Sequence, residues 1–307
     1  MKSRTVSRYR NLALFLTLAA LWGAAFMAIK AGLEFFPPVL FAAVRYDVAG
    51  VLMLAYAWYV TDKPRPETRA EWVLVGIGAV FLIAGYHVFL FVGEGNPEVT
   101  SAAAAVVVSL SPVLTTGFSR VFLPSERLAP AGLAGLLLGL VGVAVLADPG
   151  RGLTSSDTLG LLLVFGAAAS FALGSVLTEV VDAGLPIETM EAWSMVGGAL
   201  LMHVVSLGMG EPLAVTWNTE SVAAVVYLAV GASAVGFLIY FHLLDSVGPI
   251  EINLVSYVAP VFAAITGFAF LGEQLDATTA VGFLVIFAGF CLLKRDAIRA
   301  ELRRIRR

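Results

Sequence analysis

The sequence contains few charged residues and a single cysteine. Only 13% of its 307 residues are Asp, Glu, Lys or Arg, whereas about one quarter of a soluble domain is charged. Hydrophobic residues make up 59% of the chain, so most of it cannot face water and lipid is the expected solvent. Cys291 has no second cysteine with which to form an internal disulfide or a zinc site, which argues against redox and zinc chemistry.

Basic residues are missing from one long segment. No Lys or Arg occurs between Arg151 and Lys294, which excludes a nucleic-acid surface over that part of the chain. The sequence contains no Gly-Lys pair, so it lacks the phosphate loop of an ATP-driven pump. The histidines His87, His203 and His242 lack metal-ligand spacing. We therefore expect no nucleic-acid partner, no cofactor and no metal site.

Apolar runs of about the length needed to cross a bilayer repeat along the whole chain. The connections between them carry Pro, Gly and acidic residues, which suit turns at the membrane edge. The fold class is therefore predicted to be an all-α integral membrane protein. Its ten transmembrane helices are expected at about residues 12–31, 39–60, 72–92, 99–118, 128–147, 159–178, 190–209, 222–244, 252–271 and 277–293.

Clusters of Lys and Arg flank both ends of this apolar region. Because basic residues in short loops are retained in the cytoplasm, both termini are predicted to be cytoplasmic. This orientation requires an even number of crossings, which ten spans satisfy. The chain is therefore expected to be a multi-pass protein of the cytoplasmic membrane. The basic tail at 295–307 is interpreted as a topology anchor, with binding of anionic lipid as the alternative.

The two halves of the chain share a pattern. In each half, a proline is followed by an apolar run that ends at a glutamate, and glycines stand nine and sixteen residues after that glutamate. Because a unit of five spans is odd, the second copy is expected to enter the membrane inverted, an arrangement that serves alternating access. The residues are Pro112, Glu126, Gly135 and Gly142 in the first half and Pro260, Glu273, Gly282 and Gly289 in the second.

These prolines and glycines also have structural interpretations. Gly135, Gly139 and Gly142 have the small-residue spacing that lets two helices approach closely, with either another helix of this chain or a second subunit as the partner. Pro112 and Pro260 lie inside spans and are hinge candidates, with plain packing as the alternative.

Further motifs point to a known family. In the first half, a Trp-Gly pair at Trp22 lies in a span that ends near Lys30, and a proline pair at Pro37 and then Arg45 follow. Both halves close with the proline-to-glutamate pattern described above. In these features, which cover nearly the whole chain, the sequence resembles the EamA-like transporters of the drug/metabolite transporter superfamily.

The resemblance implies two EamA-like five-helix repeats, at 1–149 and 150–294, ahead of the tail. It implies a secondary transporter rather than an enzyme, which exports or exchanges a small molecule such as an amino acid, nucleoside or drug-like solute. Protons are a candidate coupling ion, and the protein is expected to act as a monomer or homodimer in the bilayer. The alternatives are a membrane-embedded enzyme and a non-transporting or lipid-flipping scaffold subunit.

Polar side chains inside spans are the candidates for substrate binding or coupling, because a charge in hydrocarbon costs at least a few kcal/mol. Long side chains near helix ends can instead reach the interface, which is the alternative for several of them. The candidates form an outer set of Lys30, Arg45, Asp47, His87 and Glu94, and an inner set of Glu179, Asp182, Glu191, His242 and Asp245.

Two helix faces complete the candidate site. Trp22 and Phe26 recur with Lys30 at four-residue spacing, so they share a face that would present aromatic walls and a cation, or would simply pack. Asn253 and Tyr257 share a second polar face that would line a cavity. His87 and His242 are candidate proton relays. His203 is predicted to be a hydrogen-bonded interior group.

Overall fold

The computed structural model describes residues 2–122, 130–146, 156–247, 252, 254–293 and 295. Within these residues every regular element is a helix, and no strand occurs. In chain order the helices are α1 (Lys2–Gly32), α2 (Pro38–Val60), α3 (Arg69–Ile77), η1 (Gly78–Gly85), α4 (Tyr86–Glu94), α5 (Ser101–Val108), α6 (Ser111–Phe122), α7 (Pro130–Leu146), α8 (Ser156–Val181), α9 (Ile187–Gly208), α10 (Thr219–Val226), η3 (Tyr227–Val235), α11 (Gly236–Val247), α13 (Val255–Thr266), η4 (Gly267–Leu271) and α14 (Ala277–Leu293).

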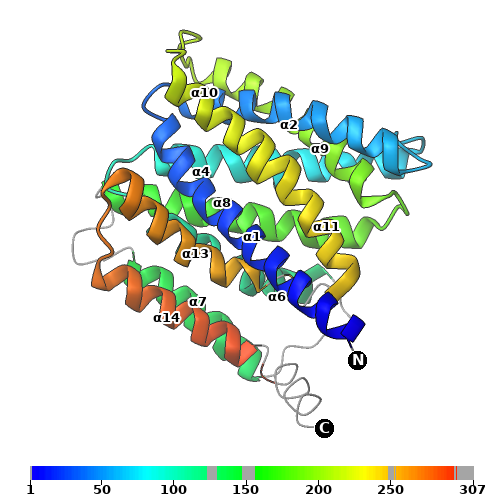
Figure 1. Ribbon diagram of the computed structural model, residues 1–307. Helices are drawn as coiled ribbons and strands as arrows, with labels where there is room; N and C mark the ends of the chain where they lie inside the picture. Colours follow the sequence, from blue (N-terminus) through cyan, green and yellow to red (C-terminus); the bar gives the residue numbers. More distant parts are fainter. Residues whose placement is uncertain are drawn as a thin grey trace.

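These helices pack as one bundle in which consecutive spans run back and forth (Figure 1). Seven stretches of the described residues are long and apolar enough to cross a membrane. Three shorter apolar helices, at Leu133–Leu146, Val255–Leu271 and Ala277–Leu292, correspond to the remaining predicted spans. The prediction of an all-α membrane fold with ten spans is therefore confirmed. The helix α1 begins and α14 ends at the same end of the bundle, as an even number of crossings requires.

Equivalent caps begin the third and eighth spans. The Thr68 side chain accepts a hydrogen bond from the Glu71 backbone N–H, and the Glu71 carboxylate accepts one from the backbone N–H of Thr68. Asn218 and Ser221 form the same reciprocal box at the start of α10. Each box satisfies backbone N–H groups that the first helical turn leaves without partners. The matching positions show that the two halves share local structure as well as sequence.

Both of these spans also contain a π-helical segment at their middle, η1 in the first half and η3 in the second. Such segments disturb the regular backbone hydrogen bonding and are frequent at functional sites. The Ser170 hydroxyl donates to the Phe81 carbonyl of η1 at 2.8 Å, and the Trp22 indole N–H donates to the Ala232 carbonyl of η3 at 3.1 Å. Each of these donors comes from the first helix of the opposite half, so the halves support each other's π segments.

The last helices of the two halves, α7 and α14, lie side by side along their length (Figure 1). A side chain at Gly142 would come within 2.6 Å of Ile286, and one at Gly289 would come within 2.7 Å of the Gly135 carbonyl. The glycines of the repeated pattern therefore allow close approach of two helices. Of the two partners that the sequence left open for Gly135, Gly139 and Gly142, the structure selects another helix of this chain.

The repeated prolines occupy different local structures. The fourth span is interrupted at Ser109 and Leu110, and Pro112 lies in the first turn of α6, where its missing N–H costs little. In contrast, α13 continues through Pro260, which sits inside the helix. Glu126 lies outside the described residues, so the ends of the two patterns cannot be compared. Among the described residues, the two prolines thus occupy different positions within their helices.

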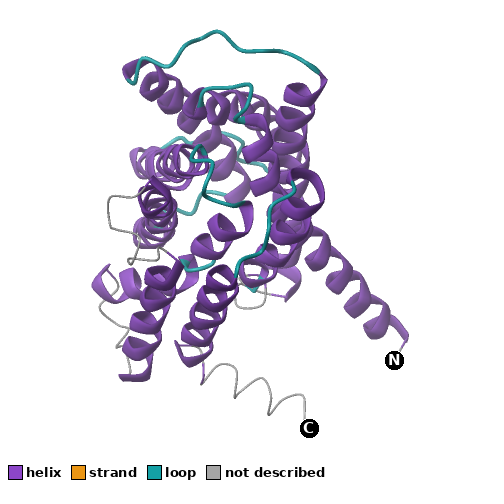
Figure 2. Cartoon of the chain, turned by 90° about the vertical axis from the view of Figure 1, so that its left-hand side faces the viewer, coloured by secondary structure: helices purple, strands orange, loops and turns teal. Residues whose placement is uncertain are grey.

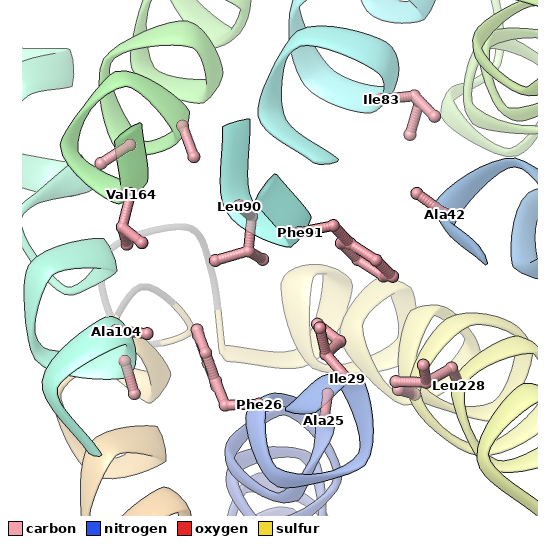
Figure 3. Packing of buried hydrophobic residues seen from close by; sticks show 14 of the residues in the cluster. Ala25, Phe26, Ile29, Ala42, Ile83, Leu90, Phe91, Ala104, Val164 and Leu228 are labelled. Atoms are coloured by element: carbon pink, nitrogen blue, oxygen red, sulfur yellow. The ribbon is translucent and has the colours of Figure 1, made fainter. Parts of the chain in front are cut away.

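The core is built from small and aromatic side chains of both halves. Figure 3 shows Phe26 and Ile29 of α1, Phe91 of α4 and Leu228 of η3 converging on one packed region. Alanines such as Ala104 let the helices around these rings come close together. Figure 2, turned from the first view, shows this helical packing extending through the depth of the bundle.

Candidate functional site

A buried arginine lies at the centre of the candidate site. Arg45 of α2 is only 6% exposed, and its Nε and Nη2 atoms donate to the Ser233 hydroxyl oxygen at 3.3 and 3.2 Å. Ser233 belongs to η3, where its hydroxyl donates to the Leu228 carbonyl at 2.9 Å. The guanidinium carbon also lies 5.0 Å from the centre of the Tyr46 ring, within the range of a cation–π contact. The arginine therefore joins the first half to the π segment of the second.

A tyrosine–histidine pair adjoins this arginine. The Tyr46 hydroxyl lies 3.0 Å from Nε2 of His87, and Nδ1 of His87 lies 2.8 Å from the Ile83 carbonyl. A carbonyl oxygen can only accept, so Nδ1 carries the hydrogen and Nε2 of the neutral ring accepts from the tyrosine hydroxyl. Both side chains are buried. The pair thus links α2 to α4, at the end of η1.

An acid and an aromatic wall complete this region. Glu191 of α9 is 8% exposed and is close enough to Tyr46 and Tyr240 to interact with them electrostatically. Trp22 of α1 packs against Tyr240 and Phe237, with ring centres 5.7 and 6.1 Å apart. All three of these aromatic side chains remain partly accessible. We define the central cluster as Arg45, Tyr46, His87, Glu191 and Ser233.

A second polar network lies where α1, α4 and η4 end. The Lys30 ammonium donates to the carbonyl of Val99 and, at 3.1 and 3.4 Å, to those of Pro97 and Asn96. It also lies 4.0 Å from the Glu273 carboxylate, which follows η4. These contacts hold the end of α1 to the α4–α5 connection and to the second half of the chain.

Glu273 also caps a helix of the first half. Its two carboxylate oxygens accept from the Ser101 backbone N–H at 3.1 and 3.0 Å, and one of them accepts from the Ser101 hydroxyl at 3.2 Å. Ser101 begins α5, so the carboxylate satisfies an N–H group at the positive end of that helix. The glutamate of the repeated motif therefore acts as a contact between the two halves.

Glu94 lies beside this network as a buried acid. It ends α4, is 1% exposed and interacts electrostatically with Lys30, Glu273 and Arg45. Neither of its side-chain oxygens has a hydrogen-bond partner among the described residues. We define the end network as Lys30, Glu94, Ser101 and Glu273.

The structure does not bring the other candidates into these groups. Asp47 lies on the outer surface of α2, where its carboxylate is 2.8 Å from Nε2 of His203. The prediction that His203 is hydrogen-bonded is confirmed, but its interior position is wrong, because its side chain is 34% exposed. Glu179 and His242 are exposed on α8 and α11. Any role of these residues in transport stays a prediction.

The remaining candidates lie in apolar surroundings or outside the described residues. Phe26 is part of the hydrophobic core, and Tyr257 packs against Phe287 and Phe290 with a hydroxyl that has no hydrogen-bond partner among the described residues. Asn253 and the tail at 296–307 lie outside the described residues.

Sequence reasoning missed three members of the two groups. Ser101 and Ser233 are common residue types in membrane helices, and nothing local marks them as partners of a distant charge. Tyr46 follows Arg45 directly, where no sequence pattern marks it as a site residue. The sequence marks Glu273 as part of the repeat, and a glutamate that recurs near the end of a span is the signal that points to it.

Comparisons with known proteins agree with this architecture. The model of the EamA-like transporter family matches this chain twice, at residues 10–147 and 158–295. The inner membrane transporter YedA of Escherichia coli K12, named as uncharacterized, is 32% identical over 276 residues, which cover 88% of this chain and 87% of YedA. The transporter YvbV of Bacillus subtilis, also named as uncharacterized, is 26% identical over 290 residues, or 94% and 93% of the two chains.

Similarity also extends to a plant protein and to a solved structure. The WAT1-related chloroplastic protein At3g02690 of Arabidopsis thaliana is 27% identical over 283 residues, which cover 89% of this chain and 66% of that protein. A crystal structure with 25% sequence identity superimposes with a TM-score of 0.65 over 95% of this chain and 99% of that one.

Proposed function

The chain belongs to the EamA-like transporter family, and from this premise we propose that it moves a small metabolite across the cytoplasmic membrane by alternating access. We propose export or exchange as the mode, with an amino acid, a nucleoside or a drug-like solute as the substrate. The inverted relation of the two halves supports this proposal, because such repeats commonly place a solute site between them.

The observation that carries the proposal is the contact of Arg45 with Ser233. A guanidinium has five N–H donors in a planar fork, and the serine hydroxyl takes only two of them. Arginine suits carboxylates because its fork can bind both oxygens at once. The central cluster therefore favours a solute with a carboxylate, next to the partly accessible rings of Trp22 and Tyr240.

The test is counterflow of radiolabelled solutes in proteoliposomes. We would load a pool of amino acids and nucleosides, measure exchange with and without an imposed proton gradient, and then test single solutes. The variant Arg45→Ala should lower the flux of a carboxylate-bearing solute by about tenfold or more, as expected when one charge-assisted contact is lost. Arg65→Ala is the matched control, because Arg65 is exposed in the α2–α3 connection.

A second variant separates charge from geometry. Arg45→Lys keeps a positive charge but loses the planar fork, so it should retain only part of the flux. Elution of each variant as a single peak on size exclusion would show that it is folded. Full flux in folded Arg45→Ala would place the solute site elsewhere. The absence of flux of any solute from folded wild-type protein would instead favour a scaffold or an enzyme.

A further inference from the structure

The side chain of Glu94 occupies an unusual position for an acid. Both of its carboxyl oxygens are buried, and neither has a hydrogen-bond partner among the described residues. An unpaired carboxylate in such surroundings costs several kcal/mol, whereas the neutral acid costs much less. The position of Glu94 in this conformation therefore favours the neutral acid over the carboxylate.

The groups that face Glu94 come from several helices. Lys30 of α1 is the cation of the end network, and Glu273 after η4 is the competing anion for that cation. From α2, Arg45 is the second cation within electrostatic range. The helix α8 meets this end of α4 through uncharged residues, since Gly93 packs against Gly160 and Val164. On α4 itself His87 is bonded to Tyr46, and from α5 Ser101 is bonded to Glu273.

Lys30 is the side chain in this network that can exchange one partner for another. Its ammonium donates to backbone carbonyls of the α4–α5 connection and pairs with Glu273 of the second half, so it joins these segments at one end of the bundle. Its contact with Glu273 is 4.0 Å, at the limit of an ion pair, and its side chain is 18% exposed. Such a contact can be exchanged for a nearby carboxylate at little cost.

We propose that Glu94 is a proton-binding site whose protonation state decides whether Lys30 closes this end of the transporter. The proposal rests on the alternating access proposed above. When the O–H bond of Glu94 breaks, the proton passes to water at this end and the electron pair stays on the carboxylate. The Lys30 ammonium then moves to Glu94 and leaves Val99 and Glu273, and the end opens. Protonation of Glu94 from water at this end reverses these steps, so the pH at this end sets the balance between its closed and open forms.

The first test uses dicyclohexylcarbodiimide, which modifies protonated carboxyl groups in apolar surroundings. Purified protein in detergent is treated from about pH 6 to about pH 9, around the range in which a buried acid titrates, and the adduct is located by peptide mass spectrometry. Glu94 should carry the adduct, and labelling should fall as the pH rises. In Lys30→Met the loss of the cation should extend labelling to higher pH, because the negative form loses its partner. Glu34→Gln, at an exposed position, should leave the profile unchanged.

The second test measures opening of the closed end. A Cys291→Ala background with Val99→Cys places one thiol at a site that is 1% exposed beneath the Lys30 contact. Its rate of reaction with a maleimide is divided by the rate for Tyr59→Cys, a 90% exposed position, to remove the pH dependence of the reagent. Glu273→Gln should raise the normalised rate by about tenfold, since local opening becomes easier when a bridging contact is lost. In the parent Val99→Cys protein the normalised rate should rise with pH as Glu94 loses its proton. Glu94→Gln, which mimics the protonated acid, should remove this rise.

Two results would overturn the proposal. One is the absence of an adduct on Glu94 at any pH, and the other is a pH-dependent thiol rate in Glu94→Gln that equals that of its parent. Glu94→Asp, which keeps a carboxyl group, serves as the second variant if Glu94→Gln does not fold. Both tests use purified protein without a solute, so their failure is separate from a failure of the flux assay.

Discussion

Arg45 and Asp47 lie two residues apart on α2, but the Arg45 side chain is buried and the Asp47 side chain is exposed. Residues at this spacing do not share a helix face, so the sequence already indicated that each needs its own partner. It could not indicate which of the two points inward, because that depends on where the other helices pack. The partner of Arg45 is Ser233, which is 188 residues away in the chain. A contact at such a separation leaves no local pattern in the sequence.

Glu211 leads to a prediction about stability. Its carboxylate accepts from the backbone N–H groups of Val39 and Leu40 at 3.0 and 2.9 Å, and from the Ser206 hydroxyl at 2.7 Å. These N–H groups begin α2, whose own N-cap residue Pro37 supplies no side-chain cap. Glu211→Ala should therefore lower the free energy of unfolding by about 1–2 kcal/mol, the usual cost of a lost cap.

The measurement for Glu211 is denaturant or thermal unfolding in a fixed detergent. Glu34→Ala is the control, because Glu34 is an exposed acid near the same end of the bundle. Equal stability of the two variants would mean that water replaces the cap without cost.

At the level of helices, the close approach of α7 and α14 leads to a second prediction. A methyl group at position 289 would lie 2.7 Å from the Gly135 carbonyl oxygen and 2.9 Å from the Gly139 nitrogen. Backbone atoms cannot turn aside as side chains do, so Gly289→Ala should cost about 1–3 kcal/mol through overpacking. Unfolding in detergent would measure this change.

Gly76→Ala provides the matched control for this helix pair. No atom lies within 4 Å of a methyl group at position 76, and the residue is helical. The same substitution should there be neutral or slightly stabilising, because alanine favours a helix over glycine by about 1 kcal/mol or less. If both substitutions changed stability equally, helix propensity rather than the close contact would be the cause.

The helices were more predictable than their irregularities. A span is visible in the sequence because about 20 apolar residues are needed to cross the bilayer. The sequence does not predict the π segments η1 and η3, since their apolar residues are the same types that form an ordinary α-helix. Their side-chain partners, Ser170 and Trp22, belong to the opposite half of the chain. Packing between the halves, rather than local propensity, therefore defines these positions.

For the whole molecule, the distribution of basic residues predicts the orientation in the membrane. A fluorescent protein fused after Arg307 should be fluorescent, because both termini are expected in the cytoplasm. Alkaline phosphatase fused at that point should be inactive, whereas the same enzyme fused after Gly210, between α9 and α10, should be active. The opposite pattern of activity would mean that both termini lie outside the cytoplasm, with the number of crossings still even.

The difference between the two repeats has a consequence for the transport cycle. The fourth span is divided into α5 and α6 ahead of Pro112, while α13 runs unbroken through Pro260. In an exchange of shapes between the halves, α13 would break before Pro260 and the fourth span would become continuous. If the proposed alternating access holds, threading each half of the sequence onto the backbone of the other should give a backbone for the opposite-facing state. The backbone of each half in this one conformation would then serve as the template for the other half in the second conformation.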